Sequence, residues 1–167
     1  MSRALAAGRS PDDTDAMKTI STSVHVQAAP RLVWEVLADL DGYPSWNPFI
    51  REAAGTVSAG RQLTLRMFPA RGKPVTFRPK VLTADPGTEL RWIGRLFMPG
   101  IFDGEHWFRL TPTDDGGTDV EQGERFSGLL VPFVGAMIAR TETGFEALNQ
   151  ALKQQTESRL RALDLGH

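Results

Sequence analysis

Apolar and polar residues alternate along residues 104–111 and 118–127, and a polar turn rich in Asp and Gly separates these two stretches. A period of two predicts strands with one apolar face, and the short turn predicts that they pair as an antiparallel hairpin. The apolar parity also contains His106, Gln122 and Glu124. Unpaired polar groups in a dry core cost on the order of several kcal/mol each, so we expect this face to line a partly polar cavity.

Periodicity is also clear in the segments before this hairpin. Residues 18–26 alternate and predict a strand with one apolar face. Pro30 suits the first position of a helix, and apolar residues then recur at helical spacing as far as Leu40, which predicts a helix of about three turns. Residues 39–48 contain two prolines and a glycine and predict a turn, a brief helix and a second turn.

Four more strands are expected between these short helices and the hairpin. They cover residues 49–57, 62–68, 75–82 and 89–96, with Gly- and Pro-containing turn signals between them. Pro79 lies inside the third of these strands and indicates an edge or a bulge there. The regular spacing of the strands favours an antiparallel meander.

The last element is predicted to be one long amphipathic helix. Apolar residues recur every three or four positions from Leu130 to Leu152, and charged residues occupy the other faces. This periodicity predicts roughly eight helical turns. Gly144 lies inside the helix, where glycine costs about 1 kcal/mol relative to alanine, so it indicates close packing or room for a ligand.

This order of elements predicts an α+β fold. One helix covers six or so strands only if the sheet curls around it, and a strongly curved sheet leaves a hollow between itself and the helix. We therefore expect a curved antiparallel sheet of about six or seven strands wrapped around the C-terminal helix, with two short helices after the first strand. The folded domain is expected over residues 17–162, after a disordered extension over residues 1–16 and before a tail over residues 163–167.

Composition excludes several classes of function. The net charge is −1 and the basic residues are scattered, so we expect no binding to nucleic acid. The chain has no cysteine, and its three histidines show no ligand spacing, so we expect no metal ion and no cofactor. No apolar stretch approaches the ~20 residues of a transmembrane helix, and a cytoplasmic location is expected. The sequence does not indicate an oligomeric state.

The predicted hairpin brings two candidate catalytic residues together. In the expected register His106 lies opposite Glu124, and Phe108 lies opposite Gln122, at Cβ separations of about 5 Å. In one interpretation Glu124 orients the imidazole and His106 moves a proton on an enolisable substrate. In the other, the two side chains satisfy each other in a polar patch that only orients a ligand. A slip of one residue would place both on the outer face.

Several segments resemble the START-like, helix-grip superfamily, also called SRPBCC. The likeness is carried by residues 24–39, 43–48, 89–92 and 126–133 together with the hairpin, and it covers about residues 17–160. The polyketide cyclase/dehydrase subgroup is the most similar. The resemblance implies the helix-grip fold and a cavity for a hydrophobic ligand, and it does not imply that the chain is a cyclase.

Twelve residues are candidates to bind such a ligand, and ordinary core packing is the alternative role for the apolar ones. They are Trp46, Trp92, His106, Phe108, Gln122, Glu124, Phe126, Phe133, Met137, Ile138, Thr141 and Phe145. The apolar loop at residues 96–101 is expected to form a lid over the cavity or an exposed contact patch.

Three functions are compatible with these expectations. The first is a non-catalytic carrier of a small hydrophobic molecule such as a lipid, a quinone or an aromatic polyketide-like compound. The second is a cyclase, dehydratase or isomerase that uses His106 and Glu124 as an acid/base pair. The third is a chaperone-like or partner-regulating domain with an exposed apolar surface.

Overall fold

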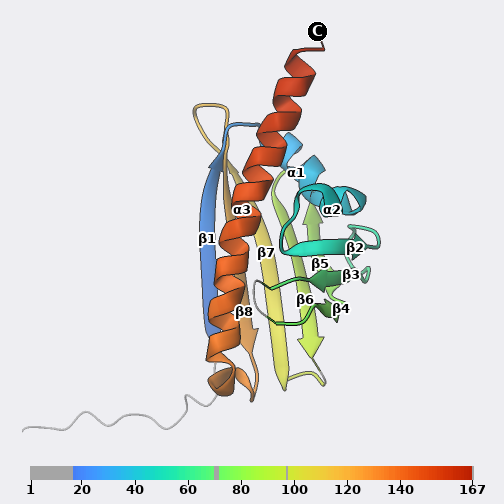
Figure 1. Cartoon of the computed structure of the whole chain (residues 1–167), viewed down its shortest axis with the longest axis vertical. Coiled ribbons are helices and arrows are strands. Elements are labelled where there is room, and N and C mark those ends of the chain that lie inside the picture. The colour runs from blue at the N-terminus through green and yellow to red at the C-terminus, as the bar shows by residue number, and fades with distance from the viewer. Residues whose placement is uncertain (1–16, 70–71, 97, 167) are drawn as a thin grey trace, which may run out of the picture.

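The computed structural model describes residues 17–69, 72–96 and 98–166 (Figure 1). The expected extension over residues 1–16 lies outside the described residues. In chain order the elements are β1 (Lys18–Val26), α1 (Pro30–Ala38), the 3-10 helix η1 (Leu40–Gly42), α2 (Tyr43–Trp46), β2 (Ile50–Ala54), β3 (Thr64–Met67), β4 (Val75–Phe77), β5 (Lys80–Asp85), β6 (Glu89–Leu96), β7 (Phe102–Pro112), β8 (Thr118–Ser127), the 3-10 helix η2 (Val131–Phe133) and α3 (Gly135–Asp164).

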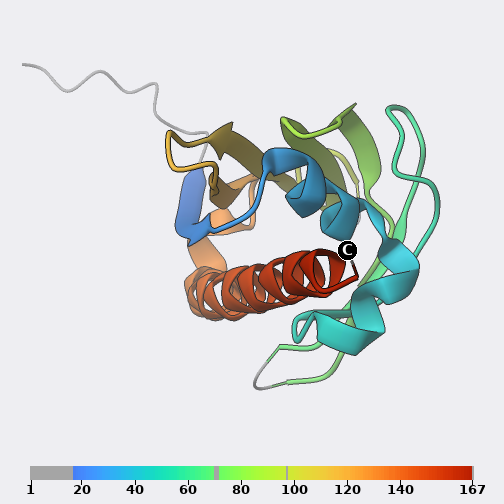
Figure 2. The same cartoon turned by 90° about the horizontal axis from the view of Figure 1, so that it is seen from above.

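The strands form two antiparallel sheets that together wrap around α3. The larger sheet has the order β1-β8-β7-β6-β5, and the smaller has the order β2-β3-β4. Backbone hydrogen bonds link the two: Val81 N donates to Arg61 O over 2.8 Å, and Leu63 N donates to Pro79 O over 2.9 Å. Seen from above, the strands follow an arc with α3 inside it (Figure 2). This arrangement confirms the helix-grip fold.

The predicted strand over residues 75–82 is wrong, because the chain divides it at Pro79. The first part is β4, which pairs with β3 in the smaller sheet, and the second is β5, which pairs with β6 in the larger sheet. Proline has no N–H to donate to a sheet ladder, so the strand ends there. Pro79 therefore marks the corner at which the chain passes from one sheet to the other.

The long helix begins later than its periodicity predicts. Residues 131–133 form η2, and Val134 has φ −112° and ψ 21°, outside the helical range, so α3 starts at Gly135. This break turns Phe133 out of the helical register, and its side chain is 82% exposed. Phe133 was expected to face the cavity, and the structure places it on the surface instead. The helix ends at Asp164, two residues beyond the expected domain boundary.

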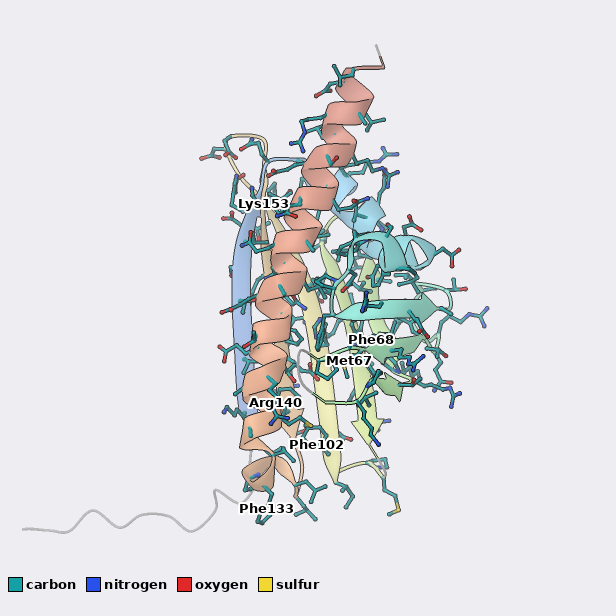
Figure 3. All side chains as sticks on the ribbon, viewed as in Figure 1. Met67, Phe68, Phe102, Phe133, Arg140 and Lys153 are labelled. Atoms are coloured by element: carbon teal, nitrogen blue, oxygen red, sulfur yellow. The ribbon has the colours of Figure 1, made fainter. Side chains whose placement is uncertain are left out.

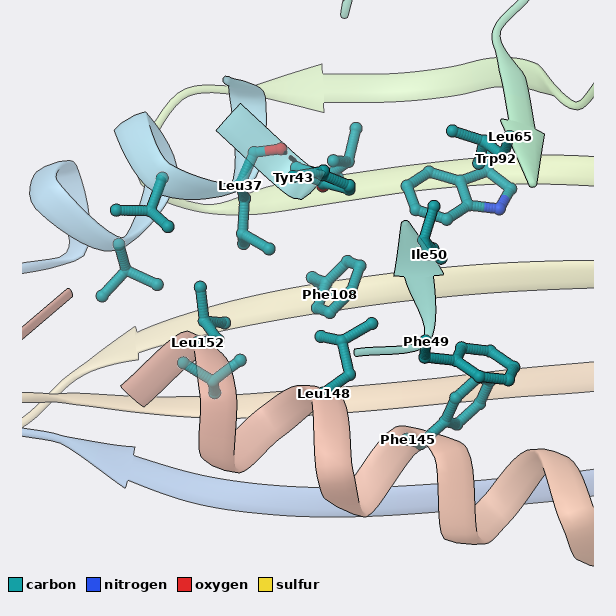
Figure 4. Close-up of a cluster of buried hydrophobic side chains, with 14 of the residues drawn as sticks. Leu37, Tyr43, Phe49, Ile50, Leu65, Trp92, Phe108, Phe145, Leu148 and Leu152 are labelled. Carbon is teal, nitrogen blue, oxygen red and sulfur yellow. Dashed lines mark hydrogen bonds between the residues drawn. The ribbon is translucent and has the colours of Figure 1, made fainter. Parts of the chain in front are cut away.

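The middle of α3 packs against the sheet through a dry core (Figure 4). Leu148 and Leu152 of the helix are fully buried, as is Phe108 of β7. At the edge of this core Asn149 Nδ2 donates to Thr22 Oγ1 on β1 over 2.8 Å. Apolar burial and this hydrogen bond hold the middle of the helix against the larger sheet. No helix among the described residues has both the length and the apolar character needed to cross a membrane.

Gly144 is the point at which α3 approaches the segment before β2. A Cβ atom at Gly144 would lie 2.7 Å from two carbons of the Phe49 ring, which confirms close packing at this glycine. The Phe49 ring also meets the Phe145 ring edge-on, with 6.0 Å between the centroids. The missing side chain of Gly144 therefore lets Phe49 lie against the helix.

We expect Gly144→Ala to destabilise the protein although alanine favours a helix. Helix propensity would add about 1 kcal/mol, whereas forcing a methyl group against a buried ring costs about 1–3 kcal/mol. Gly135→Ala is the matched control, because a Cβ atom there would meet no atom within 4 Å. Urea unfolding should show a lower free energy of unfolding for Gly144→Ala and no loss for Gly135→Ala. Equal or greater stability of Gly144→Ala would contradict the contact.

His25 links the end of β1 to the turn of the β7–β8 hairpin. Its Nδ1 lies 2.8 Å from Asp119 Oδ1, and its Nε2 lies 3.2 Å from Asp115 Oδ2. The hydrogen bond to Asp119 raises the pKa of His25 above its ordinary 6.5. Both carboxylates favour the charged imidazole.

Stability from His25 should therefore fall as the pH rises. The contribution of the charged imidazole is fully present below about pH 6.5 and is lost as the pH rises through the raised pKa of the folded state. The difference in Tm between the wild type and His25→Gln should shrink between pH 6 and pH 9, a range chosen to span that titration. An NMR titration should place the pKa of His25 above that in Asp119→Asn. A pH-independent Tm difference would argue against this ion pair.

Candidate ligand-binding cavity

A cavity of about 310 Å³ lies between the sheets and the N-terminal half of α3. Its volume is at the lower end of the range of about 300–1,000 Å³ usual for small-molecule sites. Most of the lining is apolar, and it comes from both sheets and from α3. The lining residues are Phe49, Ile50, Met67, Pro69, Gly72, Lys73, Val75, Phe77, Trp92, Gly94, Arg95, Phe102, Gly104, His106, Glu124, Phe126, Met137, Arg140, Thr141 and Phe145.

Two glycines keep the wall of the cavity free of side chains at its centre. Gly94 of β6 pairs with Gly104 of β7, and both line the cavity. A Cβ atom at Gly104 would lie 2.2 Å from Glu124 Oε1, and one at Gly94 would lie 3.2 Å from the Phe77 ring. The Gly104 position thus gives the Glu124 carboxylate room to lie across β7.

His106 is held by aromatic rings inside the cavity wall. Its imidazole stacks on the Trp92 ring with 4.6 Å between centroids and 9° between planes. The Phe145 ring of α3 meets it edge-on at 4.8 Å, and the Phe108 ring at 4.9 Å. Only 4% of His106 is exposed. These contacts fix the plane of the imidazole.

Both imidazole nitrogens of His106 are directed at neighbouring side chains of β8. Nδ1 lies 3.4 Å from Glu124 Oε2, and Nε2 lies 3.5 Å from the amide nitrogen of Gln122. With its proton on Nδ1, the imidazole donates to Glu124 and accepts from Gln122, so one tautomer serves both contacts. The hairpin register predicted from the sequence, with His106 opposite Glu124 and Phe108 opposite Gln122, is confirmed.

Glu124 brings a carboxylate to the cavity. Its side chain lines the cavity and is 18% exposed, whereas that of His106 is 5% exposed. Within the described part of the chain no group donates a hydrogen bond to Glu124 Oε1, whereas Oε2 is in contact with His106 Nδ1. Because Glu124 lines the cavity, its carboxylate has an oxygen left to accept a hydrogen bond from a group bound there.

Seven of the twelve candidate residues line the cavity. They are Trp92, His106, Glu124, Phe126, Met137, Thr141 and Phe145.

The other five have different positions. Phe108 and Ile138 are part of the dry core, and Gln122 is fully buried behind His106. Trp46 packs against Tyr43 with 5.1 Å between ring centroids, and Phe133 is on the surface. Helical spacing predicted the buried face of α3 but could not separate residues that touch the cavity from residues that touch the core.

Two groups of lining residues were not predicted from the sequence: the apolar residues of the smaller sheet and the cationic residues. Met67 and Phe77 have the apolar parity of their strands, and this signal was visible in the sequence. Lys73, Arg95 and Arg140 carry no such signal, because they come from separate segments of the chain.

The apolar loop after β6 does not cover the cavity with its described residues. Met98 is 68% exposed, Ile101 is half-buried, and neither lines the cavity. Phe97 and the side chain of Leu96 lie outside the described residues. Across the parts of the chain that the structure describes, no three side chains of His, Asp or Glu form a group that could hold a metal ion.

Solved structures with similar folds include an aromatase/cyclase and a START superfamily protein. Zhui aromatase/cyclase from Streptomyces sp. R1128 is 22% identical, with a TM-score of 0.74 over 89% of this chain and 98% of that one. A START superfamily protein from Mycobacterium smegmatis is 23% identical, with a TM-score of 0.65 over 84% and 97%. Norcoclaurine synthase from Thalictrum flavum is 14% identical, with a TM-score of 0.70 over 87% and 98%. At these identities the likeness shows the fold alone.

No curated protein sequence matches the chain. A family model described as "Polyketide cyclase / dehydrase and lipid transport" matches residues 17–157, which is most of the chain. The curved sheets, the long C-terminal helix and the cavity between them agree with that match and with the START-like neighbours. The chain therefore belongs to the polyketide cyclase/dehydrase and lipid transport family, and its fold is START-like.

Proposed function

We propose that this protein binds a small, mainly apolar molecule in the cavity, with Glu124 accepting a hydrogen bond from a hydroxyl or N–H group of that molecule. The observation that carries the proposal is a formed, mostly apolar cavity of about 310 Å³ that is lined by Glu124, whose Oε1 has no partner among the described residues. Lipids, quinols and aromatic polyketide-like compounds have this combination of an apolar body and a polar end.

The hydrogen-bonding state of Glu124 supports a ligand with a donor group. Oε2 is satisfied by His106, and Oε1 has no protein donor among the described residues. A bound molecule that displaced water without offering a donor would leave this oxygen unpaired, at a cost of about 1–3 kcal/mol. The site therefore favours an alcohol or a phenol over a hydrocarbon of the same shape.

The flat aromatic lining supports a ligand that is planar or chain-like in its apolar part. Phe102 and Phe126 stack at 5.6 Å between centroids, and Trp92 is nearly parallel to His106. These rings give broad faces on both sides of the Glu124 carboxylate. Apolar surface laid against them contributes about 25 cal/mol for each Å² removed from water.

Filling the cavity should abolish binding. Thr141 of α3 lines the cavity and its hydroxyl donates to Met137 O, whereas Thr143 is exposed, does not line the cavity and makes the equivalent bond to Ala139 O. In isothermal titration calorimetry, decan-1-ol or 2-naphthol should bind the wild type and Thr143→Phe, and should bind Thr141→Phe at least about tenfold more weakly, a loss of about 1.4 kcal/mol. Equal binding by the two variants would contradict a site in this cavity.

A second candidate function is enzymatic, and the contact between Glu124 and His106 inside the cavity favours it. Because both imidazole nitrogens are engaged, Glu124 is the group that would exchange a proton with a substrate, and His106 would be a positioning residue. A carboxylate in such a place suits abstraction of a proton from the carbon next to a carbonyl group, as in a cyclisation or an isomerisation. This assignment reverses the roles that the sequence suggested for the pair.

Hydrogen exchange of 2-tetralone in D₂O tests the enzymatic candidate. If Glu124 acts as a base, it removes an α-proton and returns a deuteron from solvent, so NMR should show exchange faster than in buffer alone. Glu124→Gln should lower that rate at least about tenfold, while calorimetry shows that the variant still binds the ketone. Exchange at the buffer rate, or at equal rates in the wild type and Glu124→Gln, would exclude Glu124 as a base for this ketone.

A further inference from the structure

Among the described residues that line the cavity, cationic side chains outnumber carboxylates. Three cationic residues, Lys73, Arg95 and Arg140, line it, whereas Glu124 is the one carboxylate among its described lining residues. Arg95 lies 3.8 Å from Asp103 Oδ1, which offsets its charge in part. The side chains of Lys73 and Arg140 make no ion pair or hydrogen bond with any residue that the structure describes.

These two cations lie at the mouth of the cavity. Of the residues that line it, Gly72, Lys73, Val75, Arg95, Met137 and Arg140 are exposed, whereas Trp92, His106 and Phe126 of the larger sheet are buried. The exposed members come from the segment that precedes and begins β4, from the end of β6 and from the first turns of α3, so residues of three elements border the opening. In Figure 3 Arg140 is on the lower part of α3, at the same end of the molecule as Phe102 of β7.

The floor of the cavity has the opposite sign. Glu124 is on β8, inside the grip of the sheet, and its carboxylate is mostly buried. A negatively charged group would be repelled from this end and attracted to the mouth, where the cations keep their charge in contact with solvent. The apolar lining between the two ends suits an uncharged body. The cavity is therefore positively charged at its mouth and negatively charged at its inner end.

We propose that the ligand is an anionic amphiphile. Its carboxylate or phosphate group lies at the mouth near Lys73 and Arg140, its apolar body extends inward past Trp92, and a hydroxyl or N–H group at its inner end donates to Glu124. This inference rests on the proposed binding function and specifies its ligand class. Arg140 presents a fork of N–H donors that suits a carboxylate or a phosphate, and Lys73 adds a point charge from the other side.

Probes with one chain and different head groups test the proposal. Calorimetry at low ionic strength should show 10-hydroxydecanoate binding about three- to tenfold more tightly than decane-1,10-diol, and (10-hydroxydecyl)trimethylammonium binding more weakly than either. 10-Hydroxydecyl phosphate in a parallel titration separates a preference for phosphate from one for carboxylate. The advantage of 10-hydroxydecanoate should shrink in 0.5 M NaCl, a concentration chosen to screen exposed charges.

Substitutions of single arginines test whether the preference for an anionic head group arises at the mouth of the cavity. Arg140→Gln should weaken 10-hydroxydecanoate binding about three- to tenfold and change decane-1,10-diol binding much less. Arg61→Gln is the matched control, since Arg61 is exposed, has no ion pair with a described residue and does not line the cavity. An equal loss in both variants would overturn the anion site. Equal affinity of the wild type for 10-hydroxydecanoate and decane-1,10-diol would overturn it while leaving the binding function intact. Failure of every probe to bind would contradict the binding function itself.

Discussion

The packing of the Phe49 ring against α3 at Gly144 joins the two parts of this fold. The middle of the helix is fixed to the larger sheet by the buried Leu148 and Leu152 and by the hydrogen bond that Asn149 donates to Thr22 of β1. Phe49 immediately precedes β2, and its carbonyl accepts a hydrogen bond from Phe68 N after β3. One ring contact therefore positions the smaller sheet relative to the helix, and the cavity is the space enclosed between that contact and the larger sheet.

The middle and the N-terminal turns of α3 pack differently against the larger sheet. The middle presents Leu148 and Leu152, which are buried in the core. The N-terminal turns line the cavity together with the glycine pair of β6 and β7, so one part of the sheet is densely covered and another part is left hollow. The polar residues of β7 and β8 lie toward the hollow end, where they have partners or solvent. Polar residues on the inner face of these strands are tolerated because α3 leaves a cavity over that part of the sheet.

The hairpin of β7 and β8 shows what the sequence could predict. Its turn and its alternation of apolar and polar residues fix both the register and the inward face, so the pairing of His106 with Glu124 followed from local information. The direction of the imidazole nitrogens did not follow, since it depends on Trp92, Phe145 and Gln122, which come from three elements.

Other parts of the site depend on contacts between distant segments. Pro79 was expected to mark an edge or a bulge within one strand, and only the fold shows that the chain changes sheets there and brings Phe77 to the cavity. Lys73 and Arg140 are 67 positions apart, 140 − 73, and nothing in either local pattern relates them. Residues of a binding site that come from separate elements become visible only when tertiary structure places them together.

The glycine pair at positions 94 and 104 also has a consequence for motion. Glycines in a strand have the largest conformational entropy to lose on folding and no side chain of their own to pack, so here the ladder between the end of β6 and the start of β7 is covered by side chains of other strands, Phe77 and Glu124. A molecule in the cavity would add packing over the pair. Occupancy and rigidity are then coupled, and slowed amide exchange at these strands would report a filled cavity.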